Sequence, residues 1–397
     1  MADNNNNKIL NVPPLRFPEF TDEWGKQKLS DFVERVTRKN KNNESKLPLT
    51  ISAQYGLVDQ ITFFNKVIAS NDISGYYLLK KGDFAYNKSY SGDYTWGAVK
   101  RLDRYEQGAL STLYICFSPL ECVISDYLVH YFETKKWHRE VSEIAVEGAR
   151  NHGLLNIGVA DYFNTKHFLP TKKEQKKIAT FLNLIEKRIA LQTKIIEDLK
   201  KLKSAIIEKL FTRGGDAVLI SDLITQVSKR NNTDYNLPVL SVNNRLGFIR
   251  QSEQFEDRTV ASDDTSNYKV VSTDDFAFNP ARINVGSIAR LKSETNGIVS
   301  PMYICFHTND RVLPEYFEYF FETKYFYSEM QKRLEGSVRL CLSWEGLCNI
   351  SISLPNIEQQ IEIGKKISTI ATKIDLEERY LQNLKLQKQY LLQQMFI

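Results

Sequence analysis

Residues 171–211, TKKEQKKIATFLNLIEKRIALQTKIIEDLKKLKSAIIEKLF, carry the most regular pattern in the chain. Two columns of positions, alternately four and three residues apart, are apolar at eight of their ten places, as in the seam that a coiled-coil helix presents to a partner. No Gly or Pro interrupts the stretch, and Pro170 stands just before it, where a helix can begin. At 1.5 Å per residue the predicted helix is roughly 60 Å long, so it needs a partner along its length. The columns consist of Ile178, Ile185, Gln192, Leu199 and Ile206, and of Leu182, Ile189, Ile196, Lys203 and Leu210.

The chain contains an internal sequence repeat, and the second copy can supply a partner helix. The tetrapeptide YICF at 114–117 returns unchanged at 303–306. The order of the other matches is the same in both halves, and the spacing between them hardly changes. We therefore interpret the chain as one ancestral unit used twice. The further matches pair 29–32 with 220–223, 83–87 with 275–279, 132–135 with 321–324, 147–148 with 335–336 and 169–170 with 354–355.

The end of the chain repeats the long helix as well. Residues 356–397 contain two columns that are again apolar at eight of ten places, and Glu377 and Lys388 interrupt them at the layers of Gln192 and Lys203. Two such helices pack most simply as an antiparallel pair. Because polar seam residues fix the register of a helix pair, we predict that Lys203 lies near Glu377. The second columns consist of Ile363, Ile370, Glu377, Leu384 and Leu391, and of Ile367, Ile374, Leu381, Lys388 and Met395.

The predicted fold class is α+β, with two pseudo-symmetric β-rich globular domains separated by an antiparallel pair of long coiled-coil helices. The predicted boundaries are 1–170 for the first domain, 171–212 for the first helix, 213–355 for the second domain and 356–397 for the second helix. The segment LRFPEF at 15–20 is expected to dock on a surface. In the first domain we predict strands at 47–52, 76–86, 96–102 and 110–117, and a helix at 125–137. The predicted helix seam consists of Ile178, Leu182, Ile185, Ile189, Ile196, Leu199, Ile206, Ile367, Ile370, Ile374, Leu381, Leu384 and Leu391.

The composition is that of an ordinary globular protein. Hydrophobic residues make up 42% and charged residues 25% of 397 residues, and no apolar run approaches the ~20 residues of a membrane span. The polar stretch at 1–7 lacks the apolar core of a signal peptide, so we expect a cytoplasmic location. A net charge of +5 permits nucleic-acid binding through local patches. The five cysteines form no C-x-x-C pair, which favours reduced, mostly buried thiols.

Each long helix opens with a similar motif. Leu-Pro at 169–170 precedes Glu-Gln at 174–175, and Leu-Pro at 354–355 precedes Glu-Gln at 358–359. The second spacing is one residue shorter, so we expect the second helix to start one residue differently. With this motif, the two variable domains and the segment GDFAYNK at 82–88, the chain resembles the specificity subunits of Type I restriction-modification systems over nearly its whole length.

The resemblance implies that each β-rich domain is a target recognition domain, which reads one half of a bipartite sequence in double-stranded DNA. It implies that the helices act as a spacer and dock two modification subunits. Those subunits would carry the adenine methyltransferase with S-adenosylmethionine, and restriction subunits with ATP and Mg would add DNA translocation and cleavage. This chain would then be non-catalytic. Since the repeats are pseudo-symmetric but differ in sequence, we expect different half-sites in opposite orientations.

Matching polar loops in the two repeats are the candidates for DNA contact. Arg, Lys, Asn and Gln side chains suit bidentate contacts with base edges. The alternative for these loops and charges is a solvated surface. The candidate base-reading residues are Gln54, Tyr55, Lys88, Ser89, Tyr90, Ser91, Tyr94, Arg150, Asn151 and His152 in the first domain, and Asn243, Asn244, Arg245, Asn279, Arg282, Asn284, Ser337 and Arg339 in the second. The candidate phosphate contacts, which would set affinity rather than sequence, are Arg38, Lys39, Lys41, Lys229 and Arg230.

Catalytic and metal-binding patterns are missing from the sequence. It contains no G-x-x-x-x-G-K-[ST] phosphate loop, and the five histidines form no metal-ligand cluster. The segment NPAR at 279–282 lacks the second proline and the aromatic residue of an amino-methyltransferase motif. The segment ETK at 133–135 resembles part of a nuclease metal site, but it returns at 322–324 within helical spacing and lacks an upstream Asp. We therefore expect no catalytic residue and no metal in this chain.

Two other interpretations stay open. The chain could be a structural scaffold whose helix pair bridges two protein-binding domains without DNA, or a self-contained nuclease. The matched polar loops that carry Lys88 and Arg282 favour the DNA reader, because a protein-binding module would not need them at equivalent positions.

Overall fold

The structure is a computed structural model that describes residues 11–65, 72–89, 94–145, 155–211, 216–231, 237–244, 246–254, 264–293, 295–337 and 339–397, with the backbone alone at 253 and 254. It divides into two compact units. The first unit comprises Met1–Gln192 and Tyr380–Ile397, and the second comprises Thr193–Arg379. Each long helix therefore contributes one part to each unit.

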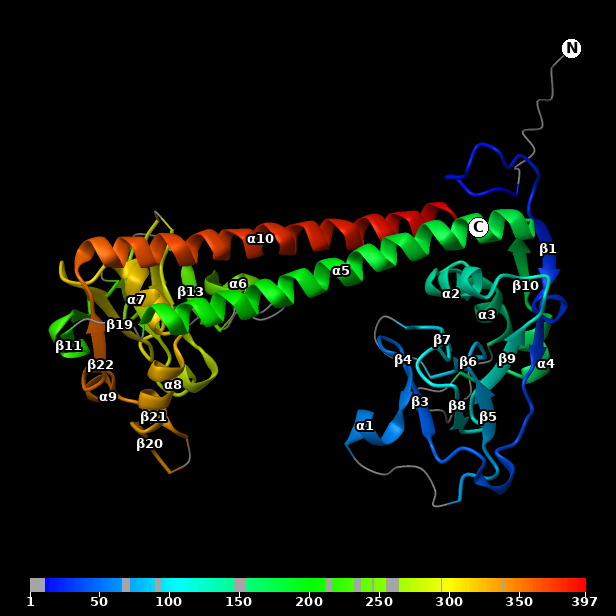
Figure 1. The fold of residues 1–397 in the computed structure, drawn as a ribbon, viewed down its shortest axis with the longest axis horizontal. Helices are drawn as coiled ribbons and strands as arrows, with labels where there is room; N and C mark the ends of the chain where they lie inside the picture. The colour runs from blue at the N-terminus through cyan, green and yellow to red at the C-terminus, as the bar shows by residue number, and fades with distance from the viewer. Residues whose placement is uncertain are drawn as a thin grey trace, which may run out of the picture. The chain divides into compact units, whose positions relative to one another are not determined.

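The first unit contains two four-stranded sheets and a two-stranded one (Figure 1). One sheet has the order β2-β9-β6-β7, namely Val33–Arg35, Ile115–Pro119, Phe84–Asn87 and Ala98–Arg101. The other has the order β4-β3-β8-β5, namely Gly56–Asp59, Pro48–Ser52, Gln107–Leu110 and Tyr77–Lys80. The pair consists of β1 (Gly25–Lys28) and β10 (Lys166–Leu169). The short helices are α1 (Gln60–Phe64), α2 (Ser125–Glu133), α3 (His138–Ile144) and α4 (Val159–Asn164).

The second unit repeats these sheets. Its four-stranded sheets have the order β12-β19-β16-β17, namely Ile224–Val227, Ile304–Thr308, Phe276–Phe278 and Ile288–Arg290, and the order β14-β13-β18-β15, namely Gly247–Arg250, Val239–Asn243, Gly297–Val299 and Lys269–Val271. Two pairs consist of β11 (Asp216–Leu219) with β22 (Ser351–Leu354), and of β20 (Leu334–Glu335) with β21 (Cys341–Leu342). The short helices are α6 (Gln251–Gln254), α7 (Pro314–Phe320), α8 (Lys324–Gln331) and α9 (Trp344–Cys348).

The repeat predicted from the sequence is confirmed strand by strand, down to the register. Phe84 of β6 faces Phe117 of β9, and Phe276 of β16 faces Phe306 of β19. The rings stack with centroids 5.4 Å apart in the first unit and 5.1 Å apart in the second. Large apolar rings that pair across neighbouring strands stabilise a sheet and pin its register. The repeated YICF tetrapeptide thus encodes one face of this central strand pair.

The strand predicted at 76–86 is wrong as a single element. The structure divides it into β5 and β6, which belong to different sheets, and Gly82 lies in the turn between them. Gly82 has φ of +93°, a backbone conformation that residues with a Cβ rarely adopt. The run predicted at 110–117 is likewise divided, because β8 ends at Leu110 and β9 begins at Ile115.

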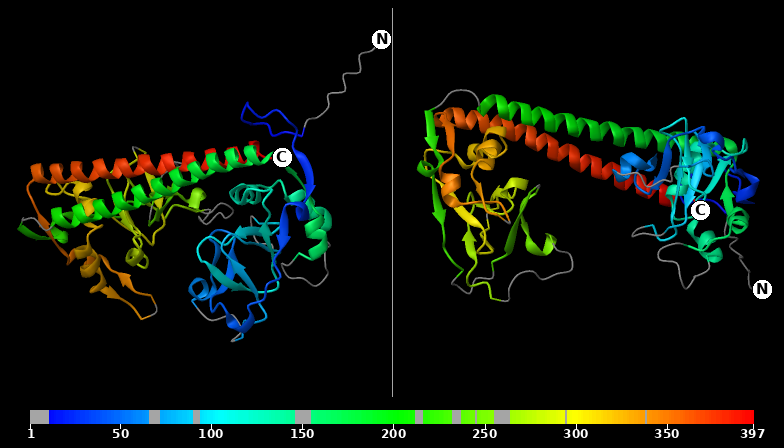
Figure 2. Two further views of the ribbon diagram at one scale, coloured as in Figure 1. Left: turned by 45° about the vertical axis from the view of Figure 1, so that its right-hand side comes forward. Right: turned by 90° about the horizontal axis from the view of Figure 1, so that it is seen from below.

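The two long helices lie close to their predicted bounds, as α5 (Lys172–Phe211) and α10 (Ile357–Gln394). In the first unit Ile178 and Leu182 of α5 share a core with Leu391 of α10. In the second unit Ile207 shares a core with Ile367. The start of α5 therefore packs against the end of α10 and the reverse, so the predicted antiparallel pairing is confirmed within each unit (Figures 1 and 2).

The predicted seam residues are all buried or half-buried. Towards the end of α5, however, Ile207 is buried at 1% exposure, whereas its neighbour Ile206 is only partly buried. Ile207 packs into the core of the second domain, whereas Ile206 and Leu210 line a groove between α5 and α10 together with Ile370. At this end α5 is thus buried more deeply against its domain than against α10.

A glutamine clamps the start of each long helix to its own domain. The Gln175 amide nitrogen donates to the Pro170 carbonyl, and its oxygen accepts from the Ile124 backbone N–H at 2.8 Å. Gln360 makes the same two contacts with Pro355 and with Leu313, the latter also at 2.8 Å. The expectation of a shifted second helix is therefore wrong. The residue equivalent to Gln175 is Gln360 rather than Gln359, and each long helix begins two residues after its proline.

The polar seam residues Lys203 and Lys388 bond to carboxylates of the domains, and Lys388 also joins α10 to α5 through Glu186. Lys388 lies 2.8 Å from Glu133, at the end of α2, and 2.6 Å from Glu186. Lys203 lies 2.7 Å from Glu322. Glu377 pairs with Lys373 on its own helix. Lys200 lies 2.6 Å from Glu378, so α5 and α10 meet at this layer, in agreement with the predicted position of Lys203 near Glu377. Each lysine reaches sideways to a repeated glutamate of the domain beneath it, because the domain lies within reach of the seam edge.

The N-terminal segment docks as predicted, on the start of α5. Arg16 lies 2.7 Å from Glu174, and Phe17 packs edge-on against Phe181 with centroids 5.8 Å apart. Lys177 lies 4.7 Å over the Phe17 ring and forms an ion pair with Glu19. A basic residue, an aromatic ring and an acidic residue of this segment thus each find a partner on one helix.

All five cysteines are free thiols, but only Cys116 and Cys305 are buried, and Cys122 is exposed. Among the described residues, no helix combines the length and the apolar content that a membrane crossing requires.

Candidate nucleic-acid interface

The predicted loops of the first unit converge where their strands end. The Tyr94 hydroxyl lies 3.5 Å from the Ala53 carbonyl, next to Gln54 and Tyr55, which are exposed. The backbone N–H of Leu155 donates to the Lys88 carbonyl at 3.0 Å. These contacts bring together the turn after β3, the loop after β6 and Leu155, which follows the predicted loop with Arg150, Asn151 and His152. Ser89 is exposed at the same place, and Tyr90, Ser91, Arg150, Asn151 and His152 lie outside the described residues.

Two of the three predicted loops of the second unit line one cavity of about 810 Å³. Asn279 directly follows β16 and is 6% exposed. Its side-chain oxygen accepts from the Ala281 backbone N–H and its carbonyl from the Arg282 backbone N–H, so it holds the loop that follows. Arg282 and Asn284 extend from that loop, and Arg339 comes from the loop between β20 and β21. Residues 240–242 of β13 form the opposite wall. Two loops and one strand that are far apart in the sequence therefore meet at one site.

Gly286 lies beside Asn244 and has φ of +88°, a backbone conformation that residues with a Cβ rarely adopt. The neighbouring Ser287 hydroxyl donates to the Val242 carbonyl at 3.1 Å. Asn244 and Asn243 thus lie beside the loop of Arg282. Ser337 is exposed near Arg339, and Arg245 lies outside the described residues.

The side chains of Arg282, Asn284 and Arg339 have no hydrogen-bond partner among the described residues, whereas Asn243 accepts from the Leu246 backbone N–H at 3.1 Å. A guanidinium with five donors and an amide with both donors and acceptors are the groups that distinguish guanine and adenine in the major groove. Their placement in one cavity without internal partners leaves them available to a ligand. This is the arrangement that a base-reading surface requires.

Three residues that the sequence did not single out line the same cavity, namely Gln251, Tyr268 and Met302. Gln251 follows β14, the hairpin partner of β13, and therefore faces the cavity from the next strand. The polar run at 250–252 after that strand was the available signal. Tyr268 and Met302 carry no such signal, because only the folding of the sheet brings them to this wall.

Most of the predicted phosphate contacts already have structural partners. Arg38 forms an ion pair with Asp83, which also accepts from Lys80 and Ser118. Lys39 donates to the Gly75 carbonyl at 2.8 Å. Arg230 donates to the Asn267 side chain, and its backbone is bridged to Lys269, beside the cavity residue Tyr268. Lys41 and Lys229 are exposed and make no side-chain contact among the described residues.

The repeated glutamate that resembled part of a nuclease site is an anchor for a long helix. Burial alone would raise the pKa of Glu133, but His130, whose Nδ1 lies 3.8 Å away, and the charge of Lys388 outweigh it and lower the pKa to about 2. His130, Glu133 and Glu186 bring ligand-type atoms within 4.8 Å of one another. The Lys388 ammonium, however, lies within 2.8 Å of both carboxylates. The place that a cation would take is thus filled by a side chain.

Fold and site together define a class of protein with two similar polar-loop domains attached to one pair of antiparallel helices. No family model matches the sequence, and no curated protein matches it. The fold, however, is that of known specificity subunits. The structure is similar to the S subunit of a Type I restriction-modification system from M. genitalium, with a TM-score of 0.56 and 15% identity over 97% of this chain and 99% of that one. A chain from a structural study of complex assembly and conformational transition in the type I R-M system is equally similar, with a TM-score of 0.56 and 15% identity over 93% and 96%.

Proposed function

We propose that the chain is the DNA-recognition and scaffold subunit of a Type I restriction-modification complex and catalyses no reaction itself. Each β-rich domain reads one half of a bipartite target, the helix pair sets the distance between the half-sites, and the helices dock two modification subunits. S-adenosylmethionine, ATP and Mg belong to the partner subunits, and the complex acts in the cytoplasm, where it meets DNA. The observation that carries this proposal is the cavity in which Arg282, Asn284 and Arg339 converge without internal partners.

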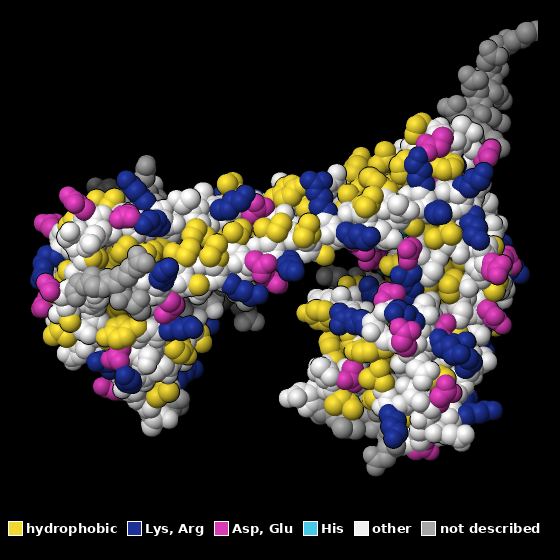
Figure 3. All heavy atoms as spheres, viewed as in Figure 1, with side chains coloured by type: hydrophobic (Ala, Val, Ile, Leu, Met, Phe, Trp, Pro, Cys, Tyr) yellow, Lys and Arg dark blue, Asp and Glu magenta, His cyan; other side chains and the backbone are white. Residues whose placement is uncertain are grey.

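The long helices support the docking part of the proposal. Leu184 and Leu191 of α5 are 58% and 60% exposed in the first unit, and Ile195 and Leu202 are 38% and 50% exposed in the second. These four residues repeat at heptad spacing, the pattern with which a helix meets another helix. Figure 3 shows hydrophobic side chains at the surface along both long helices. Apolar side chains in such a row are suited to a protein partner, and isolated ones would need no explanation.

Methylome sequencing of a strain that expresses the chain with its modification and restriction subunits tests the proposal directly. The expected result is one bipartite motif with two different half-sites in opposite orientations. Binding of the complex to that motif should weaken steeply with salt, because phosphate contacts release counterions. Absence of any motif, together with salt-insensitive or absent DNA binding, would support a scaffold that works without DNA. Metal-dependent cleavage by the chain alone would instead indicate a nuclease.

Arg282→Ala tests the base-reading cavity. A guanidinium bidentate to a guanine contributes about 1–3 kcal/mol of discrimination, so the substitution should weaken binding by that amount and relax the motif at one position of the second half-site. Fluorescence anisotropy on duplexes varied at each position measures both effects. Lys229→Gln is the matched control, which should weaken binding to all sequences alike. Equal loss at every position for Arg282→Ala would show that it contacts phosphate rather than a base.

A matched insertion tests the spacer. Two extra turns in both α5 and α10 should lengthen the unread gap of the motif while both half-sites stay unchanged. Methylome sequencing of that variant reports the gap and the half-sites together. A changed half-site would mean that the helices also take part in base reading.

A further inference from the structure

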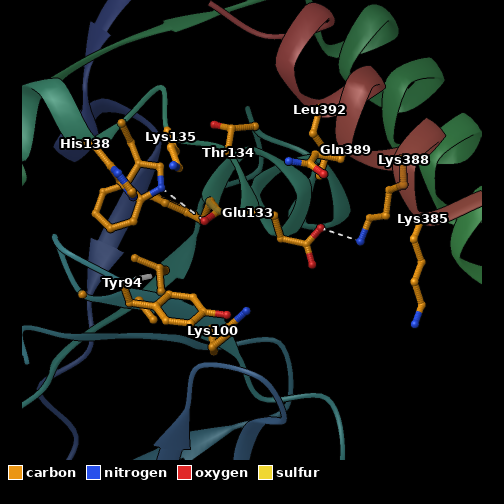
Figure 4. A pocket seen from close by; sticks show the side chains of 15 residues that line it. Tyr94, Lys100, Glu133, Thr134, Lys135, His138, Lys385, Lys388, Gln389 and Leu392 are labelled. Carbon is orange, nitrogen blue, oxygen red and sulfur yellow. Dashed lines mark hydrogen bonds and ion pairs between the residues drawn. The ribbon is translucent and has the colours of Figure 1, made fainter. Parts of the chain in front are cut away.

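A second cavity lies in the first unit, outside the predicted base-reading residues except for Tyr94. It has a volume of about 370 Å³ and is enclosed by β7, the end of α2, the start of α3 and the last turns of α10 (Figure 4). We call it the basic cavity. Four of its lining residues are lysines, and Glu133 is its one carboxylate. The lysines are Lys100, Lys135, Lys385 and Lys388.

The charges of the basic cavity are not balanced from within. Lys388 is committed to Glu133 and Glu186. Lys100, Lys135 and Lys385 have no carboxylate within ion-pair distance among the residues that the structure describes. The remaining titratable group on the wall is His138, whose pKa burial lowers to about 4, so it adds no charge at neutral pH. Glu133, Glu186 and Lys388 together carry one negative charge, so the three other lysines leave the cavity with a net positive charge of about two.

Lys100 is the most informative of the three. It is half-buried on β7, between Tyr94 and α10, where Figure 4 shows it opposite Lys385. Burial lowers the pKa of this amine most; the attraction of Glu133 and Glu186 raises it in part, and the nearby charge of Lys388 lowers it. An ammonium held out of water beside other ammonium groups is costly unless an anion joins it. The site is thus preformed for a ligand with negative charge.

The position of the cavity indicates which anion it takes. Tyr94 lines it and also contacts the Ala53 carbonyl, in the group of loops predicted to read the first half-site. The cavity therefore adjoins the loops that would meet a duplex. We propose that the basic cavity binds one phosphate of the DNA backbone through Lys100 and Lys385, and so fixes the register of the first domain on its half-site. This inference rests on the proposed function, and it adds a residue of α10 to the DNA contacts.

The second unit does not repeat this arrangement. Because Phe84 faces Arg101 and Phe276 faces Arg290, the residue equivalent to Lys100 is Ala289. The helix columns place Lys200 at the position of Lys385, and there it forms an ion pair with Glu378 at 2.6 Å. The phosphate contact is therefore a property of the first domain alone.

The test uses the chain assembled with its modification subunit, on the duplex that the methylome identifies. Log affinity is measured against log salt for the wild type, for Lys100→Gln, Lys385→Gln and their double variant, and for the control Lys81→Gln, which removes an exposed charge paired with Glu106. The double variant should lose about one unit of salt slope, the value for one phosphate contact, with the preferred sequence unchanged. The control should keep the wild-type slope. Thermal melting verifies that each variant is folded.

Neutral methylphosphonate linkages, placed one at a time in the duplex, locate the contact. One linkage should weaken the wild type but have no effect on the double variant, because the charge that it removes has already lost its partner. An unchanged salt slope, or the absence of such a linkage, would overturn the phosphate site. If inorganic phosphate raises the melting temperature of the DNA-free wild type but not of the variant, and the slope is unchanged, the cavity holds a free anion and the proposal is wrong. Absence of sequence-specific binding by the wild type would instead reject the proposed function.

Discussion

At the start of α5 the first unit buries Glu174 at 0% exposure beneath Arg16, whereas the second unit leaves the equivalent Gln359 exposed on α10. The same contrast continues along the helix. Phe181 of α5 packs on Phe17, whereas the equivalent residue of α10 is Lys366.

In the second unit this surface is an open groove of about 590 Å³, lined by residues of α5 and α10 alone. The glutamine clamps and the lysine–glutamate ties are nevertheless present in both units. The residues that occur in both repeats attach each long helix to its domain. The N-terminal segment at 15–20 packs on α5 in the first unit, and the residues that it contacts there, Glu174 and Phe181, differ from their equivalents on α10. The exposed Gln359 carries a neutral amide that needs no cation, whereas the buried carboxylate of Glu174 needs Arg16, because a buried charge without a partner is unstable.

The largest expected effect comes from removing that arginine. Arg16→Met leaves the Glu174 carboxylate, whose side chain is 1% exposed, without its cation, and should lower the free energy of unfolding by about 3–5 kcal/mol. The double variant Arg16→Met/Glu174→Gln copies the second unit and should recover most of that loss. Urea denaturation of the assembled complex measures both. A double variant as unstable as the single one would show that packing of the segment, rather than the charge, holds it.

Acid should affect the two units differently. Burial lowers the pKa of His167 to about 4, whereas its equivalent on β22 is the apolar Ile352. A depressed folded-state pKa means that the stabilisation is present above about pH 6.5 and is lost as the pH falls towards 4. The first unit should therefore lose up to about 3 kcal/mol over this range, and the half-buried His138 should add a smaller share in the same direction.

Hydrogen exchange at pH 7 and at pH 4.5, read by mass spectrometry, resolves the two units. Protection should fall more in the strands of the first unit than in those of the second. His167→Ile, which copies the second unit, should flatten this pH dependence. An equal loss of protection in both units would mean that carboxylates of the shared framework titrate instead.

The smallest expected difference between the two units lies in the ion pairs that Lys388 and Lys203 form with glutamates of the domains. Lys388 bonds to two carboxylates and has a side-chain exposure of 19%, and Lys203, also 19% exposed, bonds to Glu322 alone. Lys388→Met should cost about 2 kcal/mol and Lys203→Met about 1 kcal/mol, since partial exposure screens both pairs. Double-mutant cycles with Glu133→Gln and Glu322→Gln isolate the pair energies. A larger loss of stability for Lys203→Met than for Lys388→Met would show that Lys203, and not Lys388, forms the stronger ion pair.

The elements that repeat could be predicted from the sequence because their signals are local and regular. The apolar periodicity of α5 gave its bounds to within one residue, and the repeated tetrapeptide at β9 and β19 revealed the duplication before any sheet was known. The break between β5 and β6 was missed, since a continuous apolar run does not show which of two sheets each half joins. The partner of Lys203 was missed for a similar reason. Seam spacing describes one helix pair and carries no information on a domain packed beside it.

The sequence by itself determined the two-fold repeat, the antiparallel helix pair and the polar loops that belong to each domain. These follow from period, composition and order, which are written along the chain. Only the tertiary structure decided that Arg282, Asn284 and Arg339 share one cavity, that Tyr268 and Met302 complete it, and that Lys100 faces Lys385 across another. Such sites form from side chains that are far apart in the sequence. Their positions relative to one another are determined by how the sheets and the long helices pack.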